Sequence, residues 1–444
     1  MKIPLAPPSF QNLIAKYAQQ LPDLFERKVG PEVRGVYEHW DHLRHLTPPE
    51  GLESETWWLL IKWARSPHYR DLPLEDKSHR PIKIAVTDCM LRLLHFLDRE
   101  AAGSVQGLDS SGNPEERQRY LIRSLVEEAM TSSQLEGAST TRQVAKEMLT
   151  SGRQPRDRSE RMIFNNYKAM QQLAGWRTQP LTPRAIFEMH RILTENAIDD
   201  PTAAGRLRRQ DEQIEVVDRD GGTVLLRPPP ASELVARMQA LCDFANKEDT
   251  MGFIHPVIRA IAIHFQIGYD HPFVDGNGRT ARALFYWSML RSGYWLTEYL
   301  SISSALKKAP SQYNRAYLYT ETDDSDLGYF VSHQLQILET AVDGLRDYIG
   351  RKSRDQKAAE ALLRPGSKLG TRLNHRQREV LLHAVKNPGN IYRIREHQHS
   401  QQISYQTARN DLLGLVEESL MRQEKQSRAF VFVPVGDLAE RLKQ

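Results

Sequence analysis

Apolar residues recur every three or four positions through most of the first 350 residues, and this spacing predicts a mainly helical chain. Two stretches, 55–65 and 84–97, are rich in large apolar side chains, and we expect both to be buried helices. The stretch from His255 to Tyr269 is apolar on nearly every face, which is typical of a helix that runs through a core. Strands are expected only as exceptions.

The ends of two further helices are marked by local signals. A helix from about 115 to 133 is predicted to end at Glu136-Gly137, because glycine readily adopts the left-handed conformation that ends a helix. Thr182-Pro183 predicts the start of another helix, with threonine as its N-cap and proline in its first turn.

One β-hairpin is predicted in the middle of the chain, between Gln213 and Arg227. Two short apolar runs, 214–217 and 224–226, flank the polar, glycine-containing residues 218–222, and three prolines follow.

Breaks in the pattern divide the chain into regions. We expect an N-terminal helical region over 1–110, a larger helical domain over 111–350, and a linker over 351–371, which contains a charged stretch and an Arg-Pro-Gly-Ser break. Residues 372–444 then show an order typical of a winged helix-turn-helix domain. Its expected elements are a helix from Asn374 to Lys386, a short helix, a helix from Ser404 through Leu415 and a strand from Phe430 to Val433.

Composition narrows the class of protein. A chain of 444 residues exceeds what one core usually covers, so two or three folded units are expected. No apolar run is long enough to span a bilayer and the N-terminus shows no secretory signal, which predicts a cytoplasmic protein with no membrane partner. The only cysteines, Cys89 and Cys242, are expected to be buried thiols. A net charge of +4 permits nucleotide or acidic partners without requiring nucleic acid.

Candidate chemistry is concentrated between His271 and Arg282, where one apolar helix is followed by another. Gly276 and Gly278 open the second helix, and a helix N-terminus with close glycines is a ready anion site. Arg279 and Arg282 strengthen that interpretation, because guanidinium groups suit phosphate oxygens.

Two other residues of this segment add the remaining parts of a catalytic site. Asp275 supplies the oxygen ligand that Mg²⁺ bound to a di- or triphosphate needs. His271, with an ordinary pKa near 6.5, is suited to take a proton from an attacking hydroxyl. A base, a metal ligand and an anion site therefore occur within one turn of chain.

Three other interpretations compete with this one. The run from Gly276 to Ala281 also fits the dinucleotide pattern G-x-G-x-x-A, but that pattern follows a strand, and here a helix precedes it. His255, His264 and His271 match no strong zinc spacing, and His264 is expected to be a core residue. A plain polar turn would leave the histidine and the two arginines without a role.

Residues 271–282 match the HxFx(D/E)GNGRxxR signature without a departure, and this part of the chain resembles the Fic (filamentation induced by cAMP) family. The resemblance extends from about residue 84 to about 345. It implies a helical Fic-fold bundle and a protein adenylyltransferase, which transfers AMP from ATP to a Ser, Thr or Tyr hydroxyl of a target protein.

The resemblance also implies a role for each residue of the signature. His271 would be the general base and Asp275 would hold Mg²⁺. The anion hole for the phosphates would be formed by Gly276, Asn277 and Gly278. The β- and γ-phosphates would be contacted by Arg279 and Arg282.

A second motif lies upstream. The run from Ser132 to Gly137 fits the pattern (S/T)xxxE(G/N), which in this family belongs to an inhibitory helix, here about 115–137. A glutamate at a helix C-terminus opposes the helix dipole and needs a cation. By resemblance that cation is Arg282, and its pairing with Glu136 would leave the γ-phosphate of ATP misplaced.

Two further parts of the chain suggest partners. The hairpin from Gln213 to Leu226 resembles the family's flap, which aligns an extended stretch of target protein by strand addition. The domain over 372–444 would bind DNA, another protein or a second copy of the chain. Three acidic residues reduce the positive charge of its basic face: Asp411, Glu417 and Glu418.

The sequence leaves several functions open. Transfer of UMP, phosphocholine or a phosphoryl group would use the same fold, and the same loop could remove AMP with Glu136 positioning a water. In a different class, the chain would be a DNA-binding transcriptional regulator whose Fic-like domain senses nucleotide.

Overall fold

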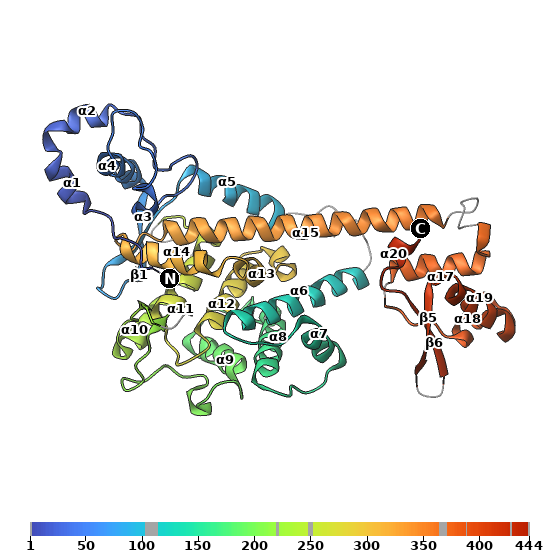
Figure 1. Ribbon diagram of the computed structural model, residues 1–444. Helices are drawn as coiled ribbons and strands as arrows, with labels where there is room; N and C mark the ends of the chain where they lie inside the picture. Colours follow the sequence, from blue (N-terminus) through green and yellow to red (C-terminus); the bar gives the residue numbers. More distant parts are fainter. Residues whose placement is uncertain are drawn as a thin grey trace. The chain divides into compact units, whose positions relative to one another are not determined.

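The computed structural model describes residues 2–102, 114–218, 222–246, 252–363, 371–387, 389–426 and 429–442. The chain divides into two compact units, Met1–Leu345 and Arg346–Gln444. The division falls inside helix α15 (Gly328–Leu362), so the first part of the predicted linker, 351–371, is helical. The described chain is mainly helical, as predicted, and its strands form three two-stranded sheets (Figure 1). Within it, every helix is too short or too polar to cross a bilayer.

The N-terminal part of the first unit combines short helices with a hairpin. Its elements are α1 (Phe10–Lys16), α2 (Leu21–Phe25), α3 (Trp40–Leu43), α4 (Ser54–Arg65), β1 (Tyr69–Glu75), β2 (Pro81–Ala85) and α5 (Asp88–Leu97). The helix predicted over 55–65 is confirmed as α4. The helix predicted over 84–97 is wrong in its first part, because Ile84 lies in β2. Alternation in the run from Pro81 to Ala85 buries Ile82 and Ile84 on one face, and pairing with β1 stabilises this strand.

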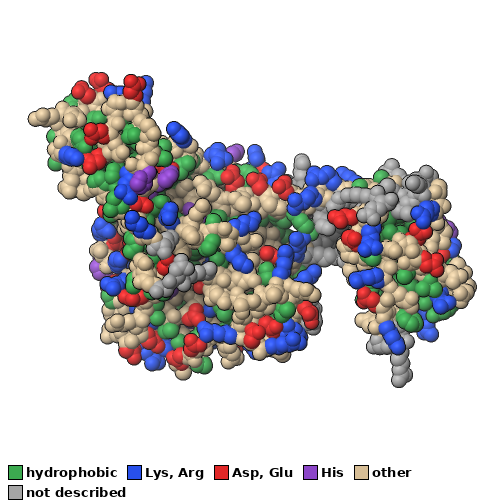
Figure 2. Space-filling model, in the orientation of Figure 1, with side chains coloured by type: hydrophobic (Ala, Val, Ile, Leu, Met, Phe, Trp, Pro, Cys, Tyr) green, Lys and Arg blue, Asp and Glu red, His purple; other side chains and the backbone are tan. Residues whose placement is uncertain are grey.

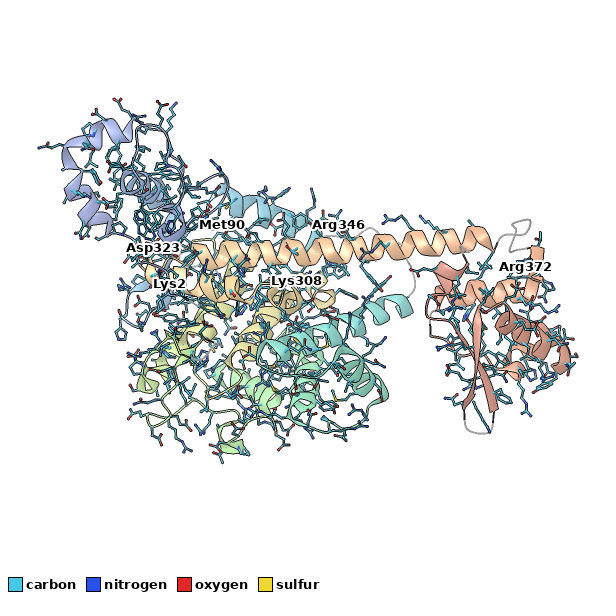
Figure 3. All side chains as sticks on the ribbon, in the orientation of Figure 1. Lys2, Met90, Lys308, Asp323, Arg346 and Arg372 are labelled. Carbon is cyan, nitrogen blue, oxygen red and sulfur yellow. The ribbon has the colours of Figure 1, made fainter. Side chains whose placement is uncertain are left out.

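Buried charges attach this N-terminal part to the end of α14 (Pro310–Thr322) and the start of α15. Lys62 on α4 pairs with Asp323, with Nζ and Oδ2 2.9 Å apart; Asp323 is labelled in Figure 3. Arg65 donates from Nη1 to the Tyr329 hydroxyl at 2.9 Å, and its guanidinium carbon lies 3.6 Å from the centre of the Tyr37 ring. Because a buried charge is costly unless it is paired, these contacts fix how the two parts meet.

The rest of the first unit is a helical bundle. Its elements are α6 (Pro114–Leu135), α7 (Arg142–Ser151), α8 (Arg158–Trp176), α9 (Pro183–Thr194), β3 (Val216–Val217), β4 (Val224–Leu226), α10 (Leu234–Asn246), α11 (Pro256–Asp270), α12 (Asn277–Arg291), α13 (Ile302–Leu306), α14 (Pro310–Thr322) and α15. The predicted start at Thr182 is confirmed, since its hydroxyl accepts from the N–H of Ala185 at 3.1 Å. The helix end at Gly137 is also confirmed, at φ +97°.

Helix α11 forms the centre of this bundle and packs along α12. Almost every residue of both helices is buried, as the apolar pattern predicts. The predicted hairpin is present as β3 and β4, paired antiparallel, although Ile214 lies outside the strand and residues 219–221 lie outside the described residues. The small hairpin and the bundle together give the fold class that the sequence predicts.

The second unit has its own core. Its remaining elements are α17 (His375–Lys386), α18 (Ile394–Gln401), α19 (Tyr405–Glu417), β5 (Met421–Gln426), β6 (Ala429–Pro434) and α20 (Leu438–Arg441). Asn374 and Ser404 cap α17 and α19, as their positions in the sequence predict. Tyr392, which lies between α17 and α18 in the chain, forms an antiparallel bridge with Phe432 on β6. A third short segment therefore joins the β5–β6 hairpin. Its identification as a winged helix stays a prediction.

Candidate active site

The candidate segment forms the connection between α11 and α12. Helix α11 ends at His271, which adopts a left-handed φ of +44° while its N–H still bonds the Ile267 carbonyl at 3.1 Å. Gly276, at φ +81°, is the N-cap residue of α12. A non-glycine residue is uncommon in this conformation, so the surrounding packing holds His271 there.

The ring of His271 has one nitrogen assigned by its partner. Nδ1 lies 2.9 Å from the carbonyl oxygen of Gly268, which can only accept, so Nδ1 carries the proton and donates it. Nε2 of the neutral ring is therefore unprotonated. Burial lowers the pKa of His271, and this effect outweighs the carboxylate of Glu136, which raises it. The histidine is thus a neutral base with its free lone pair on Nε2.

Asn277 shapes the loop with its side chain. Its Oδ1 accepts from the N–H of Phe273 at 2.9 Å and its Nδ2 donates to the carbonyl of Phe273 at 2.8 Å. The side chain is therefore bonded within the protein, and what Asn277 contributes to the N-terminus of α12 is its backbone N–H. Together with the N–H groups of Gly278 and Arg279, it belongs to the first turn, which has no partner within the helix. The glycines predict that this turn binds an anion, and this stays a prediction.

Asp275 has both carboxylate oxygens engaged. Oδ1 accepts from the N–H of Gly276 and lies 3.4 Å from Nη2 of Arg279, while Oδ2 lies 3.4 Å from Nη2 of Arg158. No group of three or more His, Cys, Asp or Glu side chains that could hold a metal occurs in the described part of the chain. A single carboxylate nevertheless fits Mg²⁺, which commonly binds through one or two carboxylates together with substrate phosphates.

Arg279 lies beneath the loop. Its side chain is buried, and Nη1 donates to the carbonyl of Leu193 at the end of α9 at 2.9 Å. Nε has no hydrogen-bond partner among the described residues. Burial lowers the pKa of Arg279 and the charge of Asp275 opposes that effect. The guanidinium therefore links Asp275 of the loop to the end of α9. Its contact with phosphate remains a prediction.

Arg282 is held by the upstream motif. Its Nε donates to the Ser132 hydroxyl at 2.8 Å and its Nη2 donates to the Ser132 carbonyl at 3.0 Å. Nη2 also pairs with Oε1 of Glu136 at 2.8 Å. Residues separated by 150 positions thus meet in one buried cluster, as the resemblance implies.

The carboxylate of Glu136 also lies against the anion site. A Cβ added to Gly278 would overlap Oε1 of Glu136 and would approach Nη1 of Arg282 to 3.0 Å. The C-terminal dipole of α6 disfavours this carboxylate, whereas the N-terminal end of α12, which it contacts, favours it. Burial would raise the pKa of Glu136, but the charge and hydrogen bond of Arg282 outweigh burial, so the pKa lies below its ordinary value.

Comparison with known proteins identifies this region. Residues 180–289 match the Fic/DOC family. Protein adenylyltransferase Fic of Drosophila willistoni is 35% identical over 114 residues, which are 26% of this chain and 20% of that protein. Protein adenylyltransferase fic-1 of Caenorhabditis elegans is 36% identical over 109 residues, or 24% of this chain and 19% of that protein. This chain carries a Fic domain.

Solved structures extend the likeness in fold. A Fic family protein from Desulfovibrio desulfuricans G20 aligns with a TM-score of 0.52 and 19% identity, over 79% of this chain and 97% of that chain. Fic-1 (residues 134–508) from C. elegans aligns with a TM-score of 0.50 and 22% identity, over 79% of this chain and 90% of that chain. At these identities the likeness concerns the fold alone. The chain matches about a fifth of the length of its curated relatives.

Two residues of the Fic domain that the sequence analysis did not single out also hold the loop. Arg208 donates from Nε to the carbonyl of His271 and from its N–H to the carbonyl of Pro272, both at 2.9 Å. His190 on α9 lies 2.8 Å from the carbonyl of Asp275 through Nε2. Their partners lie 63 and 85 positions away, so no local pattern indicates either residue.

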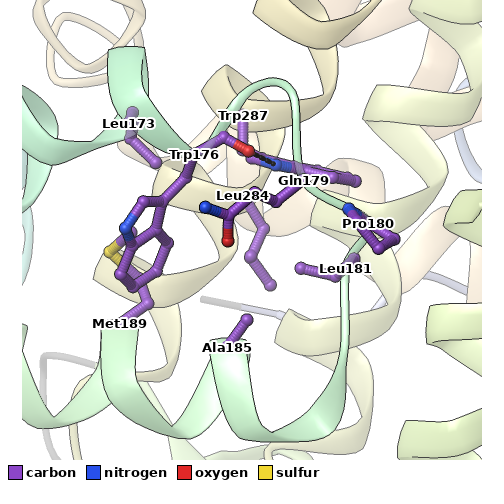
Figure 4. Close-up of a pocket in the computed structure, with 9 residues that line it drawn as sticks. All are labelled: Leu173, Trp176, Gln179, Pro180, Leu181, Ala185, Met189, Leu284 and Trp287. Carbon is purple, nitrogen blue, oxygen red and sulfur yellow. Dashed lines mark hydrogen bonds between the residues drawn. The ribbon is translucent and has the colours of Figure 1, made fainter.

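A separate hollow lies on the other side of α12. Nine residues line it (Figure 4): Leu173, Trp176, Gln179, Pro180, Leu181, Ala185, Met189, Leu284 and Trp287. Nε1 of Trp287 donates to the carbonyl of Trp176 at 3.2 Å across it. Its volume of about 20 Å³ admits roughly one water. It is too small and too apolar for a nucleotide.

Proposed function

We propose that this chain transfers AMP from ATP to a hydroxyl side chain of a target protein. One observation carries the proposal: the unprotonated Nε2 of His271 lies at one end of a loop whose other end is the N-terminus of α12, a group of backbone N–H donors suited to phosphates. The curated relatives are named protein adenylyltransferases, which supports the same chemistry for the part of the chain that they match.

The proposed reaction is a single displacement at the α-phosphorus of ATP. The target hydroxyl gives its proton to Nε2 of His271 while its oxygen bonds to the α-phosphorus. The bond from that phosphorus to the oxygen bridging to the β-phosphate breaks, and diphosphate leaves with that oxygen. The N–H groups of Asn277, Gly278 and Arg279 would stabilise the phosphate charge as it moves.

Asp275 would hold Mg²⁺ when the nucleotide is present. The ion supplies charge neutralisation of the phosphates in this chemistry. For it to be held, Arg158, whose Nη2 lies 3.4 Å from Oδ2 of Asp275, has to give up that oxygen. Its guanidinium has other acceptors within reach, since Nη1 pairs with Asp199 at 2.7 Å.

The β3–β4 hairpin would align the target protein. Val217 on β3 is exposed, and a two-stranded sheet offers an edge to which an extended peptide can add a strand. Arg208 supports this arrangement, because its Nη2 donates to the carbonyl of Pro229, just beyond the hairpin, while its Nε holds the carbonyl of His271.

Glu136 would act as a brake on this reaction. Its carboxylate pairs with Arg282 and lies against Gly278, so it fills the space in which the terminal phosphate of ATP would bind. ATP would then bind with its γ-phosphate displaced and its α-phosphorus out of line with the hydroxyl. The same site could also remove AMP by hydrolysis: Glu136 would position a water that attacks the phosphorus, and the protein hydroxyl would leave with the bridging oxygen.

The test uses the Glu136→Gly protein, Mg²⁺ and α-labelled ATP in a cell lysate, with the same protein carrying His271→Ala as control. We expect labelled protein bands with the first and none with the second. Bands of equal strength with both would contradict the assignment of the base. Transfer from labelled UTP or CDP-choline in place of ATP would show a different donor on the same fold.

We propose a second role, DNA binding, for the unit Arg346–Gln444. Residues 346–444 hold 19 of the 60 Lys and Arg but 11 of the 56 Asp and Glu, a net charge of +8 against −4 for residues 1–345. Basic and acidic side chains are interspersed over the face that Figure 2 shows. Such an excess favours phosphate backbones.

Two of the acidic residues expected to dilute the basic face are paired within the unit. Asp411 is buried and its Oδ2 lies 2.6 Å from Nε of Arg376. Glu418 pairs with Arg372 at 2.9 Å. On the other side of α19, Gln406 and Arg409 are exposed, where side chains of such a helix meet base edges and phosphates.

Binding of a random-sequence duplex, measured against salt, tests this role. We expect Arg409→Ala to weaken binding by the loss of about one phosphate contact and to reduce the salt dependence accordingly. Absence of binding, together with self-association of the chain, would show that the unit is instead a protein or dimer contact.

A further inference from the structure

His190 is a fully buried histidine with a partner on each ring nitrogen. It lies on α9 and is 0% exposed. Nε2 is 2.8 Å from the carbonyl oxygen of Asp275, and Nδ1 is 2.9 Å from the backbone nitrogen of Gly205. Its ring is stacked on Phe273, with centres 3.8 Å apart and planes 7° apart.

These partners determine where the proton is. The N–H of Gly205 can only donate, so Nδ1 of His190 is the acceptor and carries no proton. Nε2 then carries the proton and donates it to the carbonyl of Asp275. Both nitrogens are used in bonds to the backbone, which leaves no lone pair or proton for substrate. The residue can therefore position the loop but cannot transfer a proton.

The first bond reaches the part of the loop that carries the proposed metal ligand. The carbonyl of Asp275 lies directly before Gly276, the left-handed N-cap of α12. A Cβ at Gly276 would come within 2.7 Å of the Thr194 methyl carbon and 3.3 Å of Nε2 of His190. The end of α9 is thus packed against the loop at the point where the anion site begins.

The second bond reaches the segment that leads to the hairpin. Gly205 precedes Arg208, which holds the carbonyls of His271 and Pro272, and the chain then continues into β3. One side chain therefore touches both the phosphate loop and the approach to the hairpin. Arg208 adds a second connection between these two segments from the hairpin side.

We propose that His190 is a positioning residue that couples the phosphate loop to the target-binding hairpin, holding the backbone of Asp275 with one nitrogen and that of Gly205 with the other. The proposal deepens the adenylyl transfer proposed above and rests on it for its functional consequence. Its structural content, two separate bonds with separate effects, can be tested without any transfer.

Two conservative substitutions separate the two bonds. In His190→Gln the amide nitrogen can take the place of Nε2 and keep the bond to Asp275, while the acceptor for Gly205 is lost. In His190→Asn the amide oxygen can take the place of Nδ1 and keep the bond to Gly205, while the donor to Asp275 is lost.

His39 provides a matched control. It is also 0% exposed, its Nδ1 accepts from the N–H of Asp41 at 3.1 Å, its Nε2 lies 3.2 Å from the Thr322 hydroxyl, and it is stacked on Tyr319. It lies outside the proposed catalytic and binding machinery. His39→Gln and His39→Asn therefore report the cost of disturbing a buried, doubly bonded histidine in the same unit.

Each variant is made in the Glu136→Gly protein and measured in three ways: melting temperature, calorimetric binding of ATP with Mg²⁺, and steady-state transfer to the protein that is most strongly labelled in the lysate test above. We expect His190→Asn to weaken Mg·ATP binding about tenfold, the effect of losing roughly one hydrogen bond. We expect His190→Gln to keep Mg·ATP affinity within about twofold and to raise KM for the target protein. The His39 variants should lower only the melting temperature.

Equal effects of His190→Gln and His190→Asn on nucleotide affinity would overturn the proposal, because a merely structural role would not distinguish the two nitrogens. So would losses that follow the melting temperature as they do for the His39 pair. If the parent protein transfers no label at all, the adenylyl transfer fails, while the calorimetric comparison still decides the role of His190.

Discussion

At the scale of single residues, the same carboxylate does two things. Glu136 pairs with Arg282 and also covers the first turn of α12 at Gly278. A negative charge at a helix C-terminus is unfavourable, so the placement of this carboxylate over the N-terminus of a second helix explains why it is tolerated. The contact is therefore a stable part of the structure, and breaking it should change the rate of the proposed transfer.

Glu136→Gly should raise transfer by roughly ten- to a hundredfold. The change frees Arg282 for the γ-phosphate, and one charge-assisted contact in the reacting geometry contributes about 1.5 to 3 kcal/mol. Adding Arg282→Ala should remove the gain, because the released arginine is its cause. Auto-modification with labelled ATP measures all three proteins. Equal rates for the native protein and Glu136→Gly would mean that the glutamate is no brake.

The pH dependence of transfer should report His271. Burial lowers its pKa from the ordinary value of 6.5, so the neutral base persists to lower pH, and activity is lost only as pH falls through the lowered value. A profile of kcat/KM for Glu136→Gly should therefore have its acidic limb centred below the ordinary value, and loss of the Glu136 carboxylate, which raises the pKa of His271, should move that limb to still lower pH. An acidic limb centred above 6.5 would contradict this account.

The site residues that sequence predicts are those whose signal is local. The His271–Arg282 segment is contiguous, and the motif around Glu136 is short, so both are recognisable from the order of residues alone. Arg208 and His190 are not, because each acts on backbone carbonyls far away in the sequence. The occupied side chain of Asn277 and the buried position of Arg279 are equally matters of packing.

At the scale of elements, α6 is fixed to the bundle by a second glutamate. Glu128 is 1% exposed and its Oε2 accepts from the Ser301 hydroxyl at 2.9 Å and from the N–H of Ser303 at 3.0 Å. These bonds hold the helix that carries Glu136 against the start of α13. The proposed brake therefore depends on Glu128, which lies on α6 about two turns before Glu136.

Glu128→Ala should release the brake in part. The substitution leaves three donors without this acceptor, namely the Ser301 hydroxyl and the N–H and hydroxyl of Ser303, and each buried unpaired donor costs about 1 to 3 kcal/mol, which should lower the melting temperature by several degrees. The loosened helix should also raise auto-modification above that of the native protein. Glu127→Ala is the matched control, since Glu127 pairs with exposed Arg142 and surface pairs contribute about 0 to 1 kcal/mol. Higher activity in both variants would mean that α6 is not held by Glu128.

Helix ends are predictable where a cap residue marks them, as at Thr182, Gly137 and Ser404. The start of the stretch 84–97 is not, because a short apolar run fits a strand or a helix equally well and only the partner strand β1 decides between them. The bridge between Tyr392 and Phe432 escapes prediction for the same reason.

At the scale of the whole molecule, the two units have separate cores. The second unit buries its own cluster, which includes Leu381, Leu412 and Phe432. The predicted linker, 351–371, begins inside α15, because a charged stretch such as 351–356 suits an exposed helix as well as a linker. The difference in net charge between the units also emerges only once their boundary is known.

A chain ending at residue 362 should keep transfer activity. It retains all of α15 and every residue of the candidate site, so transfer by its Glu136→Gly form should stay within about twofold of the full chain. Helix content by circular dichroism and labelling by α-labelled ATP are the measurements. A folded short chain that transfers nothing would place part of the active site in residues 363–444.

The most direct test of the central claim compares two positions of the label in one experiment. Purified Glu136→Gly protein is incubated with Mg²⁺ and ATP labelled at either the α- or the γ-phosphate, beside the same protein carrying His271→Ala. Transfer of AMP predicts label on protein from α-labelled ATP only, and none in the His271→Ala form. Label from γ-labelled ATP, or undiminished labelling without His271, would contradict the account.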